Sequence, residues 1–145
     1  MLDTNTVSDL VRSPAGAVAR RISQADTTLS ISIIVAAELR YGAAKKGSVR
    51  LSASIDALLG SIDIEPLSTP ADVIYGRLRA GRERGGQPLS ANDMLIAAHA
   101  LTLDRTLVTH YAAFGRVPGL RVEDWLTGFV SLPPLAGEAT RVSER

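Results

Sequence analysis

Short segments rich in apolar and β-branched residues alternate along this chain with longer segments that have helical periodicity. The strand-like segments cover residues 28–33, 62–64, 106–109 and 120–122. Strands separated by helices of this size are typical of an α/β fold, in which the strands lie mostly parallel in a central sheet. We therefore expect a mostly parallel central sheet that is flanked by helices.

Capping and stop signals predict where the helices begin and end. A very short apolar start ends at Asp3, and a helix follows it through Val11. Ser13-Pro14 is typical of an N-cap followed by the first position of a helix, which we expect to run to about Gln24. Further helices are expected at about 35–45, 49–59, 70–84 and 90–103, with Gly47 and Gly85-Gly86 as stop signals.

Proline and glycine residues become frequent after Trp125, in a segment that begins with Thr127. Such a composition suits irregular backbone better than a core element. The sequence therefore predicts one domain over residues 1–126 and an irregular or partly disordered tail over 127–145. Only two residues precede Asp3, so the first strand should be very short, unless the true start of the protein lies upstream.

The composition limits the kind of site that this chain can hold. It contains no cysteine, so a metal ion would have to be bound by oxygen or imidazole, which favours hard cations. No apolar stretch approaches the roughly 20 residues that span a bilayer, and the N-terminus lacks a secretory signal, so we expect a cytoplasmic protein without a membrane segment. A net charge of +1 does not by itself indicate nucleic-acid binding.

Three carboxylates lie where an α/β sheet gathers its functional residues. Asp3 follows the first strand, Glu38 is near the start of the helix after the second strand, and Asp93 is near the start of the helix before the fourth. Helical spacing places both Glu38 and Asp93 on apolar faces that we expect to be buried. Glu38 shares its face with Ile34, Ala37 and Tyr41. Asp93 shares its face with Ile96, Ala97 and Ala100. A buried carboxylate needs a cation, hydrogen-bond donors or a raised pKa.

Each carboxylate also has a structural explanation. Asp3 can form an Asx turn, Glu38 can pair with an arginine, and Asp93 can complete a capping box with Ser90. Their common placement favours one shared site for a hydrated hard cation such as Mg²⁺. Such an ion can activate water and stabilise charge on a phosphate, although the residues do not decide between one ion and two.

Four stretches around these residues resemble the PIN-domain ribonucleases, and most closely the VapC toxins of bacterial toxin–antitoxin pairs. They are Leu2–Asn5, Ser32–Ala43, Leu89–Ala98 and Thr106–Trp125. The resemblance implies a PIN-like fold and a Mg²⁺ or Mn²⁺ site made by Asp3, Glu38 and Asp93. It implies an endonuclease that cuts single-stranded or looped RNA such as tRNA, a homodimer, and neutralisation by a cognate VapB-type antitoxin. It also implies that Asn5 supports the first aspartate and that Thr109 belongs to the strand end that closes the site.

The chain departs from the family pattern after the strand at 106–109. Many relatives have a fourth acidic residue there, but no carboxylate occurs between Thr109 and Phe114. His110 can contact metal-bound water or phosphate, although a lone histidine is more often structural. An alternative is therefore a catalytically weak PIN-like module that binds RNA or a partner. A phosphoacceptor receiver domain is less compatible, because no lysine follows Lys46.

Overall fold

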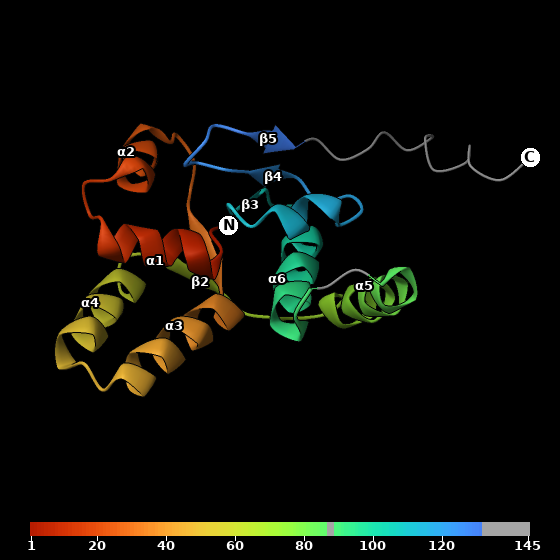
Figure 1. The fold of residues 1–145 in the computed structure, drawn as a ribbon, viewed down its shortest axis with the longest axis horizontal. Helices are drawn as coiled ribbons and strands as arrows, with labels where there is room; N and C mark the ends of the chain where they lie inside the picture. The colour runs from red at the N-terminus through yellow and green to blue at the C-terminus, as the bar shows by residue number, and fades with distance from the viewer. Residues whose placement is uncertain (87–88, 132–145) are drawn as a thin grey trace, which may run out of the picture.

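The computed structural model describes residues 1–86 and 89–131 of the chain, and its sheet is built from very short strands (Figure 1). These strands are β1 (Ser30–Ser32), β2 (Asp63–Glu65), β3 (Leu107–Val108), β4 (Val122–Glu123) and β5 (Val130–Ser131). β1 pairs in parallel with β2, β3 pairs in parallel with β4, and β5 lies antiparallel to β4. Leu2 joins the two halves through parallel bridges to Ile31 and Val108. The expected mostly parallel sheet and very short first strand are both confirmed.

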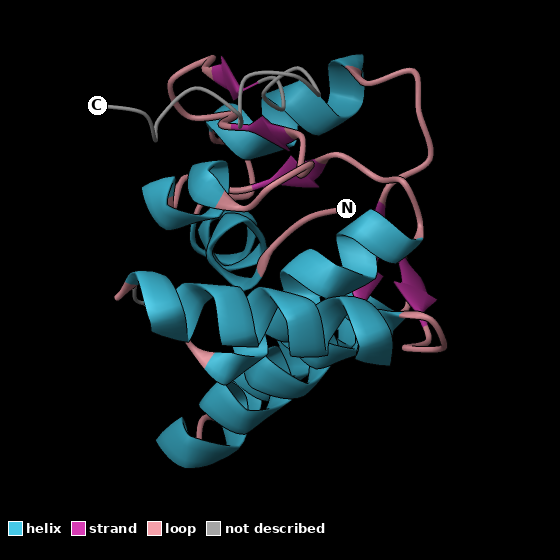
Figure 2. Cartoon of the chain, turned by 90° about the vertical axis from the view of Figure 1, so that its right-hand side faces the viewer, coloured by secondary structure: helices cyan, strands magenta, loops and turns pink. Residues whose placement is uncertain are grey.

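Helices account for most of the described chain, and the small strands lie among and beside them (Figure 2). Helices α1 to α4 gather on one side of Figure 1, and α5 and α6 pack against each other on the other side. Their bounds are α1 (Thr4–Arg12), α2 (Ala17–Gln24), α3 (Ile33–Lys46), α4 (Val49–Leu59), α5 (Ala71–Gly85) and α6 (Ala91–Thr102), with a short 3₁₀ helix η1 (Ala112–Arg116). None of the described helices is long and apolar enough to cross a membrane.

The predicted helix ends are mostly confirmed. Gly47 and Gly86 end α3 and α5 with φ angles of 63°, the left-handed conformation that glycine adopts without a steric penalty. The predicted start of α2 is wrong. Ser13 ends α1 instead, because its N–H donates to the carbonyl of Asp9, and Gly16 is the N-cap of α2.

The strand predictions differ from the structure at their ends. β1 stops at Ser32 because the side chain of Ser32 accepts the N–H of Ile34 and begins α3. The predicted strand at 120–122 is shifted to β4, and η1 and β5 were not expected. Residues 127–131 belong to a turn and β5, whereas the rest of the predicted tail lies outside the described residues. The division after residue 126 stays a prediction.

The centre of the core is formed by fully buried apolar side chains from the sheet and from α6. Leu2, Ile31, Leu107 and Ile96 have at most 1% of their surface exposed. Burial of such a side chain contributes about 1.5–3 kcal/mol to folding. Because Leu2 and β3 are neighbours in the sheet, the residues that follow them, Asp3 and Thr109, emerge together at one edge. The core thereby positions the candidate site.

Candidate active site

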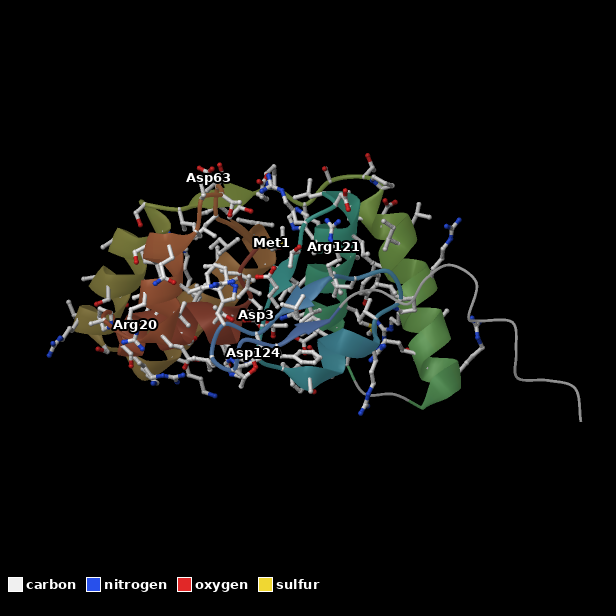
Figure 3. All side chains as sticks on the ribbon, turned by 90° about the horizontal axis from the view of Figure 1, so that it is seen from above. Met1, Asp3, Arg20, Asp63, Arg121 and Asp124 are labelled. Atoms are coloured by element: carbon white, nitrogen blue, oxygen red, sulfur yellow. The ribbon has the colours of Figure 1, made fainter. Side chains whose placement is uncertain are left out.

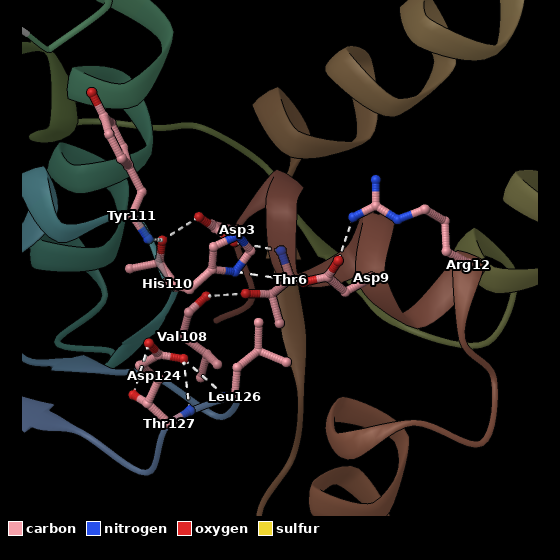
Figure 4. Close-up of polar contacts among 11 residues, drawn as sticks. Asp3, Thr6, Asp9, Arg12, Val108, His110, Tyr111, Asp124, Leu126 and Thr127 are labelled. Atoms are coloured by element: carbon pink, nitrogen blue, oxygen red, sulfur yellow. Dashed lines mark hydrogen bonds and ion pairs between the residues drawn. The ribbon is translucent and has the colours of Figure 1, made fainter.

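Asp3 is buried at the point where Leu2 leaves the sheet and α1 begins (Figures 3 and 4). Its side chain is the N-cap of α1, with Oδ1 accepting the N–H of Thr6 at 2.8 Å, while the Thr109 hydroxyl donates to Oδ2. Burial raises the pKa of Asp3, and the bonds from Thr109 and Thr6 and the nearby His110 oppose this rise. Asp3 therefore does form a helix cap, and it is also held at the edge where a ligand can approach.

Glu38 connects α3 to the beginnings of α1 and α6. The Thr4 hydroxyl donates to Oε2 of Glu38, and the Asn92 side chain donates to Oε1 at 3.1 Å. In the described part of the chain, Glu38 forms no ion pair with an arginine. Two polar side chains thus orient this carboxylate from opposite sides.

The predicted burial of the face around Glu38 is wrong. Tyr41 is 66% exposed and Ala37 is exposed, whereas Val35, Ala36, Leu39 and Ala43 form the buried face of α3. Alanine occurs on several sides of this helix, so the apolar pattern did not distinguish one face from another. Glu38 is consequently only partly buried.

Asp93 lies in the first turn of α6, as the sequence predicted. The side chain of Ser90 caps the helix by accepting the N–H of Asp93 at 3.0 Å, and Ile96, Ala97 and Ala100 on the same face are buried. Partial burial raises the pKa of Asp93, the negative charges of Glu38 and Asp3 raise it further, and hydrogen bonding with Ser90 opposes the rise. Asp93 is therefore close enough to both other carboxylates to feel their charge.

All three carboxylates line one pocket of about 510 Å³. They reach it from the start of α1, from α3 and from the first turn of α6, and the partial positive charge at the N-terminal ends of α1 and α6 favours negative charge there. Its remaining lining residues are Thr4, Asn5, Tyr41, Ser90, Asn92, Ile96 and Tyr111. The structure thus gathers into one hollow the residues that the sequence places 35 and 55 positions apart.

The pocket offers a hard cation the carboxylate oxygens of Asp3, Glu38 and Asp93. Within residues 1–86 and 89–131, no three histidine or carboxylate side chains are gathered tightly enough to hold one ion between them. Mg²⁺ usually keeps several water molecules and binds only one or two carboxylates directly. Carboxylates that are too far apart to bind one ion directly together therefore suit a hydrated ion. Burial is the main cause of the raised pKa of Asp93, and a bound cation would relieve the further rise that comes from the charges of Glu38 and Asp3. The residues present therefore fit a hydrated divalent metal.

The supporting residues differ in part from those expected. Asn5 is exposed and lines the pocket, but among the described residues it makes no hydrogen bond to Asp3. The Nδ1 atom of His110 lies 3.5 Å from Oδ2 of Asp9, whose carboxylate also binds Arg12 (Figure 4). The contact from Thr109 to Asp3 places that residue at the site, as expected.

Sequence reasoning missed four polar or aromatic contributors to the site. Thr6 and Thr4 hold carboxylates from the first turn of α1, and Asn92 holds Glu38 from α6. Tyr111 forms part of the pocket wall. The only sequence signal for them is their position next to the motifs that contain Asp3, Asp93 and Thr109.

Comparisons with known proteins identify the fold and the kind of site. Residues 1–120 match the PIN domain family. Ribonuclease VapC2 of Rickettsia felis is 38% identical over 69% of this chain and 76% of that protein, and the tRNA(fMet)-specific endonuclease VapC of Salmonella typhimurium is 32% identical over 86% and 96%. The solved VapBC2 complex of Rickettsia felis, bound to a promoter DNA fragment, matches with a TM-score of 0.81 and 33% identity over 86% of this chain and 97% of that chain. The chain belongs to the PIN-domain family, and within it to the VapC ribonucleases.

Proposed function

We propose that this endoribonuclease cuts single-stranded or looped RNA, such as tRNA, in a reaction that depends on Mg²⁺ or Mn²⁺ bound at Asp3, Glu38 and Asp93. The observation that carries the proposal is the meeting of these three carboxylates in one pocket, where burial raises the pKa of Asp93 and the charges of Glu38 and Asp3 raise it further. Repulsion of this kind favours binding of a divalent cation. The relative from Salmonella typhimurium is a tRNA(fMet)-specific endonuclease, which supports tRNA as the substrate class.

The protein side chains have distinct parts in this proposal. When bound, a divalent metal lowers the pKa of water and stabilises negative charge on the phosphate. Thr109 and Thr6 fix the orientation of the Asp3 carboxylate, and Thr4 and Asn92 fix that of Glu38. His110 brings a group that can carry positive charge to the edge of the site, where it can attract the phosphate.

We also propose that a VapB-type antitoxin neutralises the enzyme. The matched Rickettsia felis structure is a VapBC2 complex, which supports a partner of this kind. In this chain, a groove of about 290 Å³ lies between α1, α3 and α4 and shares Thr4 and Glu38 with the carboxylate pocket. Val11, Leu39, Leu51 and Ile55 give it an apolar lining. A partner segment in this groove would reach the carboxylates. The homodimer stays a prediction.

The purified protein tests the proposed reaction. We expect Asp3→Asn and Asp93→Asn each to abolish RNA cleavage in Mg²⁺ or Mn²⁺ without loss of the fold. Asp63→Asn is the matched control, because Asp63 is exposed on β2, away from Asp3 (Figure 3). Sequencing of RNA 5′ ends from the wild-type reaction would identify the cut sites. Cleavage at the wild-type rate by either active-site variant would refute the assignment.

A further inference from the structure

A second hollow of about 480 Å³ lies next to the carboxylate pocket, and we refer to it as the aromatic pocket. It is formed by the end of β3, by η1, by β4 and by the turn before β5. Its lining includes His110, Tyr111, Gly115, Asp124, Thr127 and Phe129. Among the described residues, Tyr111 is the one that lines both hollows, so the two hollows meet at this residue.

Tyr111 is held in place by contacts that begin at the carboxylate site. The Tyr111 N–H donates to the hydroxyl of Thr109 at 3.0 Å, and that hydroxyl donates to Asp3. The Tyr111 ring packs edge-on against Phe114, with ring centres 5.9 Å apart, and Phe114 is fully buried. The position of the Tyr111 ring is therefore fixed relative to Asp3, although 41% of the residue is exposed.

Phe129 presents a second aromatic ring to the aromatic pocket from the turn before β5. The Asp124 carboxylate accepts the N–H of Leu126 at 2.9 Å and the Thr127 hydroxyl at 2.9 Å, and the Asp124 N–H donates to the carbonyl of Phe129 at 2.7 Å. These bonds fix the turn (Figure 4). Phe129 nevertheless remains 61% exposed, so its apolar surface is available to a ligand.

The polar groups beside these rings suit the edge of a base. The Nδ1 atom of His110 faces Asp9 at 3.5 Å, and in the described part of the chain Nε2 makes no hydrogen bond. Unpaired nucleotides in RNA are recognised by stacking on aromatic side chains and by hydrogen bonds to their base edges. Two exposed rings and a histidine around one hollow provide both kinds of contact.

We propose that the aromatic pocket binds an unpaired nucleobase of the RNA, next to the nucleotide whose phosphate lies at the carboxylates. The inference rests on the proposed function and adds a determinant of specificity to it. Its basis is the continuity of the two hollows through Tyr111, since a strand that leaves the carboxylate pocket past this ring enters the aromatic pocket. A base within a duplex cannot enter such a hollow, so the pocket selects unpaired RNA.

Two variants test the pocket by opposite changes. Phe129→Ala removes an aromatic surface, and its control is Leu126→Ala, which removes an exposed apolar side chain from the same turn but from another hollow. Gly115→Leu adds bulk at the lining of the aromatic pocket, and the backbone tolerates it because a Cβ at Gly115 meets no atom within 4 Å. Its control is Gly81→Leu on α5, where a Cβ is equally unobstructed.

The assay is cleavage of a single-stranded RNA pool with a randomised segment, read by sequencing of product ends and by steady-state kinetics on one preferred RNA. We expect Phe129→Ala and Gly115→Leu to lower kcat/KM by roughly 5- to 150-fold, mainly through KM, which is the range for loss of one stacked base. Both should flatten the base preference at one position beside the cut. The two control variants should behave as wild type.

The outcomes separate this inference from the proposed function. Failure of the wild-type protein to cut RNA would refute the proposed function itself. Wild-type cleavage with unchanged base preference and KM in both pocket variants would overturn the nucleobase pocket alone. A loss of antitoxin inhibition in Phe129→Ala, with cleavage unchanged, would also overturn it and would assign the hollow to a protein segment.

Discussion

Replacement of Thr109 by valine should weaken both the fold and the site through a single hydroxyl group. Thr109 is 2% exposed; its hydroxyl donates to Oδ2 of Asp3 and accepts the N–H of Tyr111. Valine keeps nearly the same shape but can make neither bond. The variant leaves a buried carboxylate short of one donor and removes the link between the site and Tyr111.

The expected loss follows from these two bonds. A hydrogen bond to an ionised group is worth about 1.5–3 kcal/mol and a neutral one about 0.5–1.5 kcal/mol, so the free energy of unfolding should fall by about 2–4 kcal/mol. For a chain of this size, that corresponds to a decrease in Tm of roughly 6–12 °C. The Thr109 bond also lowers the pKa of Asp3, so Thr109→Val should raise that pKa further. Metal affinity or activity should decrease about 10- to 100-fold.

Thermal unfolding in EDTA, followed by circular dichroism, measures the loss of stability. The deficit of Thr109→Val should be largest above the folded-state pKa of Asp3 and should shrink as the pH falls through it, because a protonated carboxyl no longer requires the donor. Thr109→Ser is the matched control, since it keeps the hydroxyl. A Thr109→Val protein that melts and cleaves like wild type would refute this account of Asp3.

Three further predictions concern charge, backbone conformation and packing. Asp93→Asn should melt at a higher temperature than the metal-free wild type at pH 7. The folded-state pKa of Asp93 is raised, so its ionisation destabilises the fold increasingly as the pH rises above the unfolded value of 3.8. Thermal melts in EDTA over a pH series should show that the advantage of the variant vanishes below that value. Gly47→Ala should lower the free energy of unfolding by about 1–2 kcal/mol because φ at this position is 63°. Gly42→Ala lies within α3, where an added Cβ meets no atom, and should raise that free energy by about 0.5–1 kcal/mol. Urea midpoints that moved in the same direction in both variants would contradict this explanation. Leu107→Ala in β3, which is 0% exposed, should cost about 2–5 kcal/mol in urea unfolding, and a loss below about 1 kcal/mol would contradict its place in the core.

The predictable part of the fold depends on local signals. The alternation of strand-like and helical segments indicates a mostly parallel sheet, and Gly47, Gly86 and Ser90 mark helix ends through their backbone and capping chemistry. β5 has no such signal. It is two residues long and depends on a turn that Asp124 stabilises and on pairing with β4.

The placement of the carboxylates could be predicted, but the side chains that hold them could not. Asp3 and Asp93 lie at helix starts that the sequence marks, so their placement follows from local rules. The donor that completes Asp3 comes from Thr109, which is 106 positions away, and only the pairing of Leu2 with β3 brings the two together. The environment of Glu38 was predicted wrongly because alanine on several sides of α3 conceals which face is buried.

Titration calorimetry of Mg²⁺ and of Mn²⁺ into the metal-free protein is the most direct test of the central claim that Asp3, Glu38 and Asp93 hold one hydrated cation, in part through its water molecules. The account predicts saturable binding by the wild type, loss of most of that affinity in Asp3→Asn, Glu38→Gln and Asp93→Asn, and no change in the Asp63→Asn control. Wild-type affinity in all three active-site variants, or absence of binding by the wild type, would contradict it.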